Sequence, residues 1–162
     1  MLTSTSTAIL LGLALLAAPA KESWDAANPA MARATFLPRT AVIEVDGQPR
    51  GRGSVELEVT DPKRTFRLRL SAEGFEPAEA VVEAGAIARQ QFFLALRPAG
   101  FERKVDPTDA PSMALAASAL WRAGRVDDAA DYAEQSLRGG NTPLANRVLG
   151  EVWRKRGDRD QA

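Results

Sequence analysis

The fold of this chain is decided by three pieces of sequence: ALWRAGRVDDAA (residues 119–130), GGNTP (139–143) and VLGEVWRKRGDRDQA (148–162). On both sides of Gly124, apolar residues recur every three or four positions, which is the spacing of one face of an α-helix. Glycines and a Thr-Pro pair interrupt the pattern where helices commonly end and begin. The stretch therefore predicts a helix, a glycine turn and an alanine-rich helix, followed by the start of a second such pair.

Three helices follow from this pattern, at residues 111–124, 126–139 and 143–157. Either Thr108 or Asp109 is placed to cap the first helix, and Asp127 is placed to cap the second. The apolar stripes expected to face one another are Leu115, Ala116, Ala119, Leu120 and Ala123 on the first helix, Val126, Ala129, Ala130, Ala133 and Leu137 on the second, and Ala145, Leu149, Val152 and Trp153 on the third. Because so many of these residues are alanines, we expect the helices to approach one another closely.

This arrangement resembles the tetratricopeptide repeat, a helix-turn-helix unit of about 34 residues. Gly124 recurs 33 residues later as Gly157, and residues 149–153 read LGEVW, which matches the Leu-Gly-x-x-Tyr of the repeat's first helix. The first unit lacks the Leu-Gly pair. A register shifted by one residue, which aligns Pro111 with Pro143, stays open.

The resemblance implies about one and a half repeat units over residues 111–162 and a role in binding proteins. The chain stops at Ala162, where the second helix of the second unit is expected to begin. An apolar stripe with a basic rim on the third helix then needs cover, because stacked neighbours supply the core of such arrays. The candidate partner-binding residues on it are Val148, Leu149, Val152, Trp153 and Arg156. The alternative role for these residues is packing in the core. The apolar stripe would then be covered by the second helix, the β region, another protein, a second copy of the chain, or residues that follow Ala162 in a longer chain.

Residues 39–98 have a period of two, which is typical of strands with one face in a core and one in water. The expected strands lie at residues 41–45, 55–59, 66–71, 79–83 and 89–96, with turns at Asp46-Gly47, Asp61-Pro62 and Ala84-Gly85. Five short strands at this spacing predict a small antiparallel β-sandwich. If the second and third strands pair, Glu56 and Glu58 lie opposite Arg67 and Arg69 on the outer face.

Four pieces of this region, PRTAVIEVDG (38–47), LSAEGFEP (70–77), VVEAG (81–85) and FFLALRP (92–98), resemble the PEGA-type and carboxypeptidase-regulatory-like β modules. The sequence departs from them at residues 51–54 (GRGS). The resemblance implies an extracytoplasmic, non-catalytic β-sandwich used for attachment or as a spacer. Within it, Gly74 is expected to take a positive φ in a tight turn, and Phe75 to cover the end of the sandwich.

Residues 1–20 contain an apolar run of about a dozen residues that ends in small residues, which is typical of a signal peptide and too short for a membrane span. No Lys or Arg precedes the run, and an uncleaved anchor or a buried helix is the alternative. Residues 21–38 lack a sustained period and are interpreted as a connector, and residues 99–110 as a linker. We therefore expect an exported protein, either periplasmic, in the cell envelope or secreted, with no stable membrane span in the mature chain.

The composition excludes several kinds of chemistry. The 162 residues include no Cys and no His, which rules out thiolate and histidine nucleophiles, bases and zinc ligands. Lys plus Arg equals Asp plus Glu at 21 each, so there is no basic excess for nucleic acid. The acidic residues Asp127, Asp128, Asp131 and Glu134 fall on one helix, where a capping and solvated role is expected rather than a metal site.

The sequence thus predicts an α+β protein in separate modules: a small antiparallel β-sandwich followed by an α-helical hairpin repeat. We expect no catalytic residues, cofactor or metal. The leading hypothesis is an exported scaffold or adaptor that binds partner proteins through the helices, with a homo-oligomer through the incomplete repeat as one form of it. The alternative is a β module that binds glycan or cell-wall polymer, with the helices stabilising it.

Overall fold

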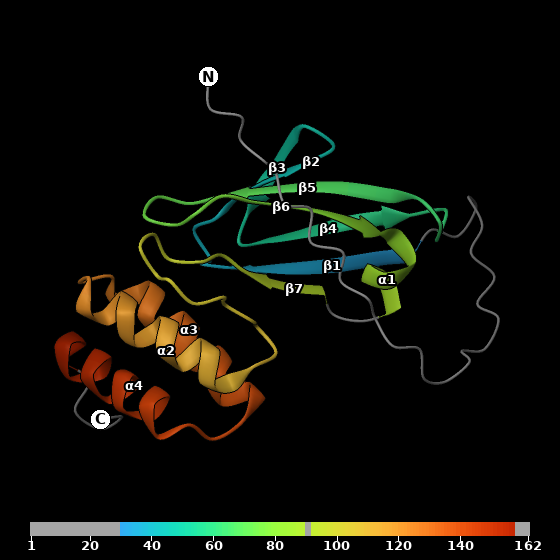
Figure 1. The fold of residues 1–162 in the computed structure, drawn as a ribbon. Helices are drawn as coiled ribbons and strands as arrows, with labels where there is room; N and C mark the ends of the chain where they lie inside the picture. The colour runs from blue at the N-terminus through green and yellow to red at the C-terminus, as the bar shows by residue number, and fades with distance from the viewer. Residues whose placement is uncertain (1–29, 90–91, 158–162) are drawn as a thin grey trace.

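The computed structural model describes residues 30–89 and 92–157. The segment expected to be a signal peptide lies outside these residues, as does most of the expected connector. The described residues form a β region of two sheets and, after it, the three helices α2, α3 and α4. Figure 1 shows these helices packed beside one end of the layered sheets and the short helix α1 at the other end. The predicted fold class is confirmed, since a two-sheet β region is followed by separately packed helices.

Within the described ranges the β region has seven strands, with bounds β1 Ala30–Leu37, β2 Val42–Val45, β3 Gln48–Arg52, β4 Ser54–Val59, β5 Thr65–Ser71, β6 Ala78–Glu83 and β7 Phe92–Ala95. One sheet has the order β4-β1-β7 and the other the order β3-β2-β5-β6. All pairs are antiparallel except β1 with β7, which run parallel. The sandwich is therefore mixed where an antiparallel one was expected.

The alternating residues of β4 and β5 behave as predicted. Every second side chain on these strands is buried between the sheets and the others face outward. The turn expected at Asp46-Gly47 joins β2 and β3, and both of its residues have positive φ, 52° and 77°. This backbone matches the right-handed twist of a two-residue hairpin.

Three expectations about the strands were wrong. The connector predicted over residues 21–38 contains β1, which is the central strand of its sheet. The segment predicted as a turn and a long strand at residues 84–96 forms helix α1, Ala84–Arg89, before the short β7. Finally, β4 pairs with β1 and not with β5, so the predicted facing of Glu56 and Glu58 with Arg67 and Arg69 does not occur. Alternation fixes the face of a strand but not its neighbour.

The helices follow the predicted boundaries closely, with α2 at Ala110–Arg122, α3 at Val126–Gly139 and α4 at Pro143–Arg156. Asp109 caps α2 through a hydrogen bond from the Ser112 amide, and Gly157 ends α4 in the left-handed conformation. Asp127 is not a cap, because α3 begins one residue earlier. The glycine pair after α3 was expected to end that helix in the left-handed conformation, but Gly140 ends it in an extended one, at φ 159° and ψ 160°.

The predicted stripes of α3 and α4 largely match their buried faces, whereas that of α2 is rotated. Ala123 of the expected α2 stripe is exposed, while Met113, Ala114 and Ala117 are buried. On α3, Ala133 is fully buried as expected. A single cluster of buried side chains runs from the sheets into the helices, and Val105 of the connecting segment belongs to it. The two parts therefore share one continuous apolar core.

Candidate functional site

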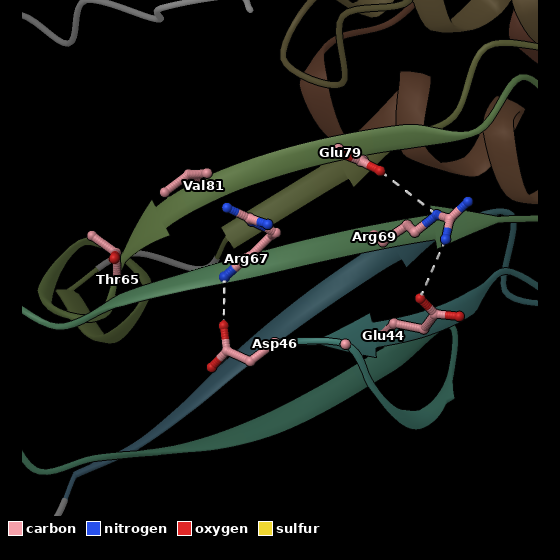
Figure 2. A pocket seen from close by; sticks show the side chains of 8 residues that line it. Glu44, Asp46, Thr65, Arg67, Arg69, Glu79 and Val81 are labelled. Carbon is pink, nitrogen blue, oxygen red and sulfur yellow. Dashed lines mark hydrogen bonds and ion pairs between the residues drawn. The ribbon is translucent and has the colours of Figure 1, made fainter.

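The outer face of the four-stranded sheet carries a shallow hollow of about 570 Å³ (Figure 2). It crosses the strands β2, β5 and β6, and its lining residues are Glu44, Asp46, Gly47, Thr65, Arg67, Arg69, Glu79 and Val81. These side chains point outward because they occupy the positions that alternate with the buried ones. The hollow is the first candidate for a ligand site.

Charges in the hollow are mostly compensated. Arg69 lies between two carboxylates, with its Nη1 3.9 Å from Glu44 Oε2 and its Nε 3.6 Å from Glu79 Oε1. Asp46 accepts a hydrogen bond of 2.9 Å from the Arg67 amide and lies 3.5 Å from Arg64 Nη2. The Arg67 guanidinium forms no ion pair with any described residue. The hollow therefore offers one uncompensated cation to an anionic group.

The hollow is lined by carboxylates that are at least partly open to solvent. Its carboxylates lie on an exposed sheet face, which neither desolvates them nor excludes water from a substrate. Within residues 30–89 and 92–157, no three acidic side chains gather in a way that would hold a metal ion. What the face can do is bind a ligand through charge and hydrogen bonds.

The second candidate is the contact between the β region and α3, which centres on Tyr132. Its side chain is fully buried, and its hydroxyl donates to the backbone carbonyls of Leu96 and Leu37. Its ring stacks on Phe75, with centroids 6.0 Å apart and an angle of 24° between the planes. Burial, helped by the negative charges of Asp128 and Asp131, raises the pKa of Tyr132 far above its ordinary value. The hydroxyl therefore stays a proton donor.

Arg125 forms the second part of this contact. Its guanidinium donates to the Glu73 carbonyl, its Nε lies 2.7 Å from Asp128 Oδ2, and it covers the Phe75 ring at 4.6 Å. The close approach depends on Gly74, which has φ +76° and where a Cβ would lie 1.8 Å from Arg125 Nη1. The positive φ predicted for Gly74 is confirmed, and Phe75, predicted to cover the end of the sandwich, is buried against Tyr132 and Arg125.

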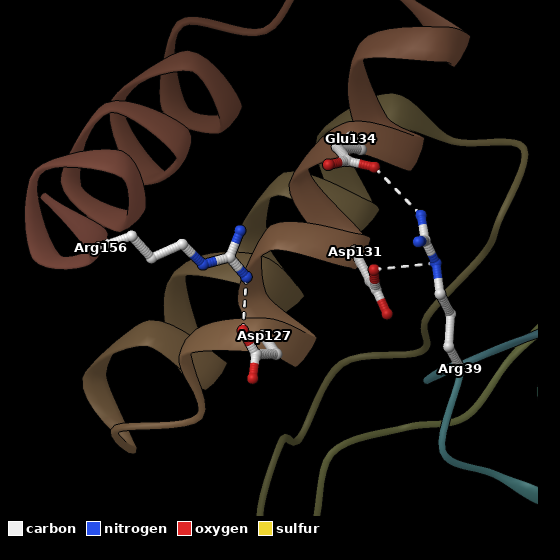
Figure 3. Close-up of polar contacts among 5 residues, drawn as sticks. All are labelled: Arg39, Asp127, Asp131, Glu134 and Arg156. Carbon is white, nitrogen blue, oxygen red and sulfur yellow. Dashed lines mark hydrogen bonds and ion pairs between the residues drawn. The ribbon is translucent and has the colours of Figure 1, made fainter. Parts of the chain in front are cut away.

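Arg39 forms the third part, as Figure 3 shows. Its Nε lies 3.0 Å from Asp131 Oδ1 and its Nη2 3.2 Å from Glu134 Oε2. Burial raises the pKa of Asp131, and the positive charge of Arg39 offsets only part of that rise. Figure 3 also shows Arg156 of α4 paired with Asp127 of α3.

The four acidic residues of α3 form ion pairs in addition to the solvated role predicted for them. All four pair with arginines, and three of those pairs reach other parts of the structure: Asp127 with Arg156, and Asp131 and Glu134 with Arg39. Asp128 pairs with Arg125 within its own helix turn. The acidic face of α3 therefore contributes to contacts between elements, while the Asp127 side chain, 90% exposed, keeps the solvated position that was predicted.

The five predicted partner-binding residues separate into two groups. Val148, Leu149 and Val152 are buried, because α4 packs on α2 and α3, so these three have the core role that was the alternative. Trp153 is half-buried at the edge of the core, and Arg156 is exposed. Binding of a partner through Trp153 and Arg156 stays a prediction.

Sequence reasoning missed Tyr132, Arg125 and Arg39. One signal was present for the first of them: Tyr132 is the chain's single tyrosine and lies among the alanines of α3. A tyrosine in an apolar helix face needs a hydrogen-bond partner from another element. No comparable signal identifies the two arginines, since arginines are abundant throughout the chain.

Comparison of the chain with protein-family models, curated proteins and solved structures finds no match.

Proposed function

We propose that this protein is a non-catalytic scaffold or adaptor, exported to the cell envelope, which binds partner proteins through its helical segment. The docking of α3 on the β region carries the proposal. The β region and the helices are joined by polar contacts of Tyr132, Arg125 and Arg39. Phe75 packs against the Tyr132 ring in the same contact. A helical segment held in this way is offered to a partner in one orientation, which lowers the entropy cost of binding.

The chemistry of the described residues supports a binding role. The most buried carboxylates of α3, Asp128 and Asp131, are paired with arginines. In the described ranges no helix is long and apolar enough to cross a membrane. On α4, Trp153 and the exposed Arg156 offer an aromatic edge beside a cation, a combination enriched at protein interfaces.

The test is affinity capture from an envelope fraction with the mature chain as bait. Trp153→Ala and Arg156→Ala are expected to lose the partner. Arg147→Ala is the matched control, because Arg147 is an exposed arginine of the same helix whose ion pair, with Glu151, stays within that helix. Circular dichroism of each variant confirms folding. A partner retained equally by all variants, or recovery of the native protein uncut from the cytosol, would contradict the proposal.

A second function, binding of a glycan or cell-wall polymer by the β region, is favoured by the hollow of Figure 2. Arg67 supplies a cation for anionic groups of such a polymer, although the hollow contains no aromatic side chain on which a sugar would stack. Arg67→Ala is expected to reduce retention of the full chain on cell-wall material, and Arg52→Ala on the edge strand β3 serves as control. Any fragment used instead must begin before Ala30, because β1 is the centre of its sheet.

A further inference from the structure

The two edges of the four-stranded sheet differ in how they are protected. The edge strand β3 contains Pro49 and a register shift opposite residues 43 and 44, and all its residues are exposed. Prolines and bulges discourage the addition of another strand. The other edge, β6, has no proline and pairs with β5 in unbroken register. Among the described elements β5 is the one strand beside β6, so its second edge is open.

The inner face of β6 is incompletely covered. Its inward side chains, Ala78, Ala80 and Val82, are only half-buried, whereas every inward side chain of β5 is buried. The facing sheet has three strands against four, so the outermost strand lacks a full partner layer. On the outer face, Val81 is 68% exposed and is one of two large apolar residues so exposed in the described chain. An added strand would cover apolar surface on both faces.

Charge decides which strand fits. Glu79 and Glu83 flank Val81 on the outer face. In a symmetric antiparallel pair of two copies with Val81 opposite Val81, Glu79 would lie opposite Glu83 at both ends, and facing like charges destabilise such a pair. Glu79 already lies 3.6 Å from Arg69, while Glu83 has no ion pair with a described residue. The edge therefore favours a basic strand over a second copy.

We propose that the open edge of β6 accepts an extended segment of another protein. Along its outer face, that segment carries an apolar residue with one basic residue on each side. Small apolar residues alternate with these three and face inward. Main-chain hydrogen bonds to β6 supply affinity, and the alternating side chains supply specificity. This surface is separate from the helical segment, so it stands whether or not the helices bind a partner.

The probe is a fluorescent, end-blocked peptide of the sequence lysine-valine-leucine-valine-lysine, measured by fluorescence anisotropy against the full chain. As a strand it places both lysines and the leucine on one face. We expect it to bind at least about tenfold more tightly than a peptide of the same composition that begins with the two lysines in a row, because each matched cross-strand pair adds a fraction of the affinity.

Backbone methylation distinguishes strand addition from electrostatic adsorption. Amides at alternate positions of a strand point to opposite edges, so only one set can donate to β6. Two peptides are compared, one methylated on both valine nitrogens and one on the nitrogens of the leucine and the second lysine. One of them is expected to lose binding and the other to keep it within about twofold.

Variants of the protein locate the site. Val81→Lys places a positive charge on the proposed edge and is expected to weaken binding by about tenfold. Gln48→Lys makes the same charge change on the opposite edge and is expected to leave binding unchanged. Both positions are exposed, so both variants should fold. No binding of the alternating peptide at millimolar concentration, equal binding of the rearranged peptide, equal effects of the two methylations, or unaffected binding to Val81→Lys would each overturn the proposal.

Discussion

At the scale of single residues, Tyr132 of α3 joins the helices to the β region. Its hydroxyl reaches from α3 into the β region, where it donates to the Leu96 carbonyl and lies 3.4 Å from the Leu37 carbonyl, which also accepts from the Leu96 amide. Buried carbonyls left without a donor cost free energy because they have given up their water.

Tyr132→Phe tests this role. The change keeps the ring that stacks on Phe75 and removes only the hydroxyl. We expect a loss of about 1–3 kcal/mol in the free energy of unfolding, measured by urea denaturation. Phe66→Leu, within the sheets, provides a comparison for an ordinary core change that leaves the contact intact. An unchanged stability for Tyr132→Phe would mean that the two hydrogen bonds contribute nothing.

Asp131 makes a pH-dependent contribution whose sign follows from its raised pKa. A carboxyl with a raised pKa in the folded state stabilises the protein below its unfolded pKa, and this stabilisation is lost as the pH rises through the folded value. We therefore expect Asp131→Asn to gain stability relative to the natural protein between about pH 4 and about pH 7, measured by urea denaturation at both values. Glu134→Gln, which removes the other carboxylate on Arg39, reports the effect of the ion pair itself. A relative loss for Asp131→Asn over the same interval would contradict the expectation.

At the scale of elements, the passage from β3 to β4 depends on Gly53. It has φ +68°, and a Cβ there would lie 2.5 Å from the backbone oxygen of Arg39. Gly47, in the β2–β3 turn, has φ +77° but open space around the same position. A substitution at Gly47 would therefore test backbone strain alone, whereas one at Gly53 would test strain together with a steric collision.

Gly47→Ala is expected to cost about 1 kcal/mol, from the left-handed conformation alone. Gly53→Ala is expected to cost about 2 kcal/mol more, because the colliding atom is backbone and cannot turn away. Thermal unfolding of the two variants side by side gives the comparison. Equal losses would show that the crossing between the sheets adjusts freely.

The packing of α3 depends on its small residues. Ala133 is fully buried in the core, whereas Ala123, just beyond the end of α2, is exposed. Ala133→Leu is expected to overpack the helices and to lower the free energy of unfolding by about 1–3 kcal/mol. Ala123→Leu adds the same atoms in solvent and is expected to change it by less than about 0.5 kcal/mol. Unaltered thermal stability of Ala133→Leu would argue against close helix packing.

At the scale of the whole molecule, the continuous core predicts joint unfolding of the two parts. One cluster of buried residues extends through both, and the contacts of α3 tie them together. Two-state behaviour is expected where a single core is disrupted at once.

Hydrogen exchange read by mass spectrometry measures this directly. In mild denaturant, peptides covering β5 and α2 are expected to exchange with the same free energy of opening. The double variant Arg39→Ala with Arg125→Ala removes polar contacts between α3 and the β region on two sides of Tyr132. In this variant we expect the free energies of opening for β5 and for α2 to differ. Different free energies of opening for β5 and α2 in the natural protein would show that the β region and the helices unfold separately.

By itself, the sequence determined the elements that local physics controls. The period of two in residues 55–59 and 66–71 predicted β4 and β5 with the right faces, and the glycines and Asp109 predicted where the helices begin and end. It also determined the exclusion of cysteine and histidine chemistry. These properties depend on side chains a few positions apart, so they can be recognised without the fold.

Tertiary structure alone decided which strands are neighbours and how the two parts meet. The sequence predicted neither the strand β1 nor its pairing with β4, and it did not predict the hydrogen bonds of Tyr132 to residues 36 and 95 positions away. The incomplete cover of the inner face of β6 is likewise a result of having four strands against three. Such features depend on complementary surfaces brought together by folding, for which the order of residues along the chain carries no local pattern.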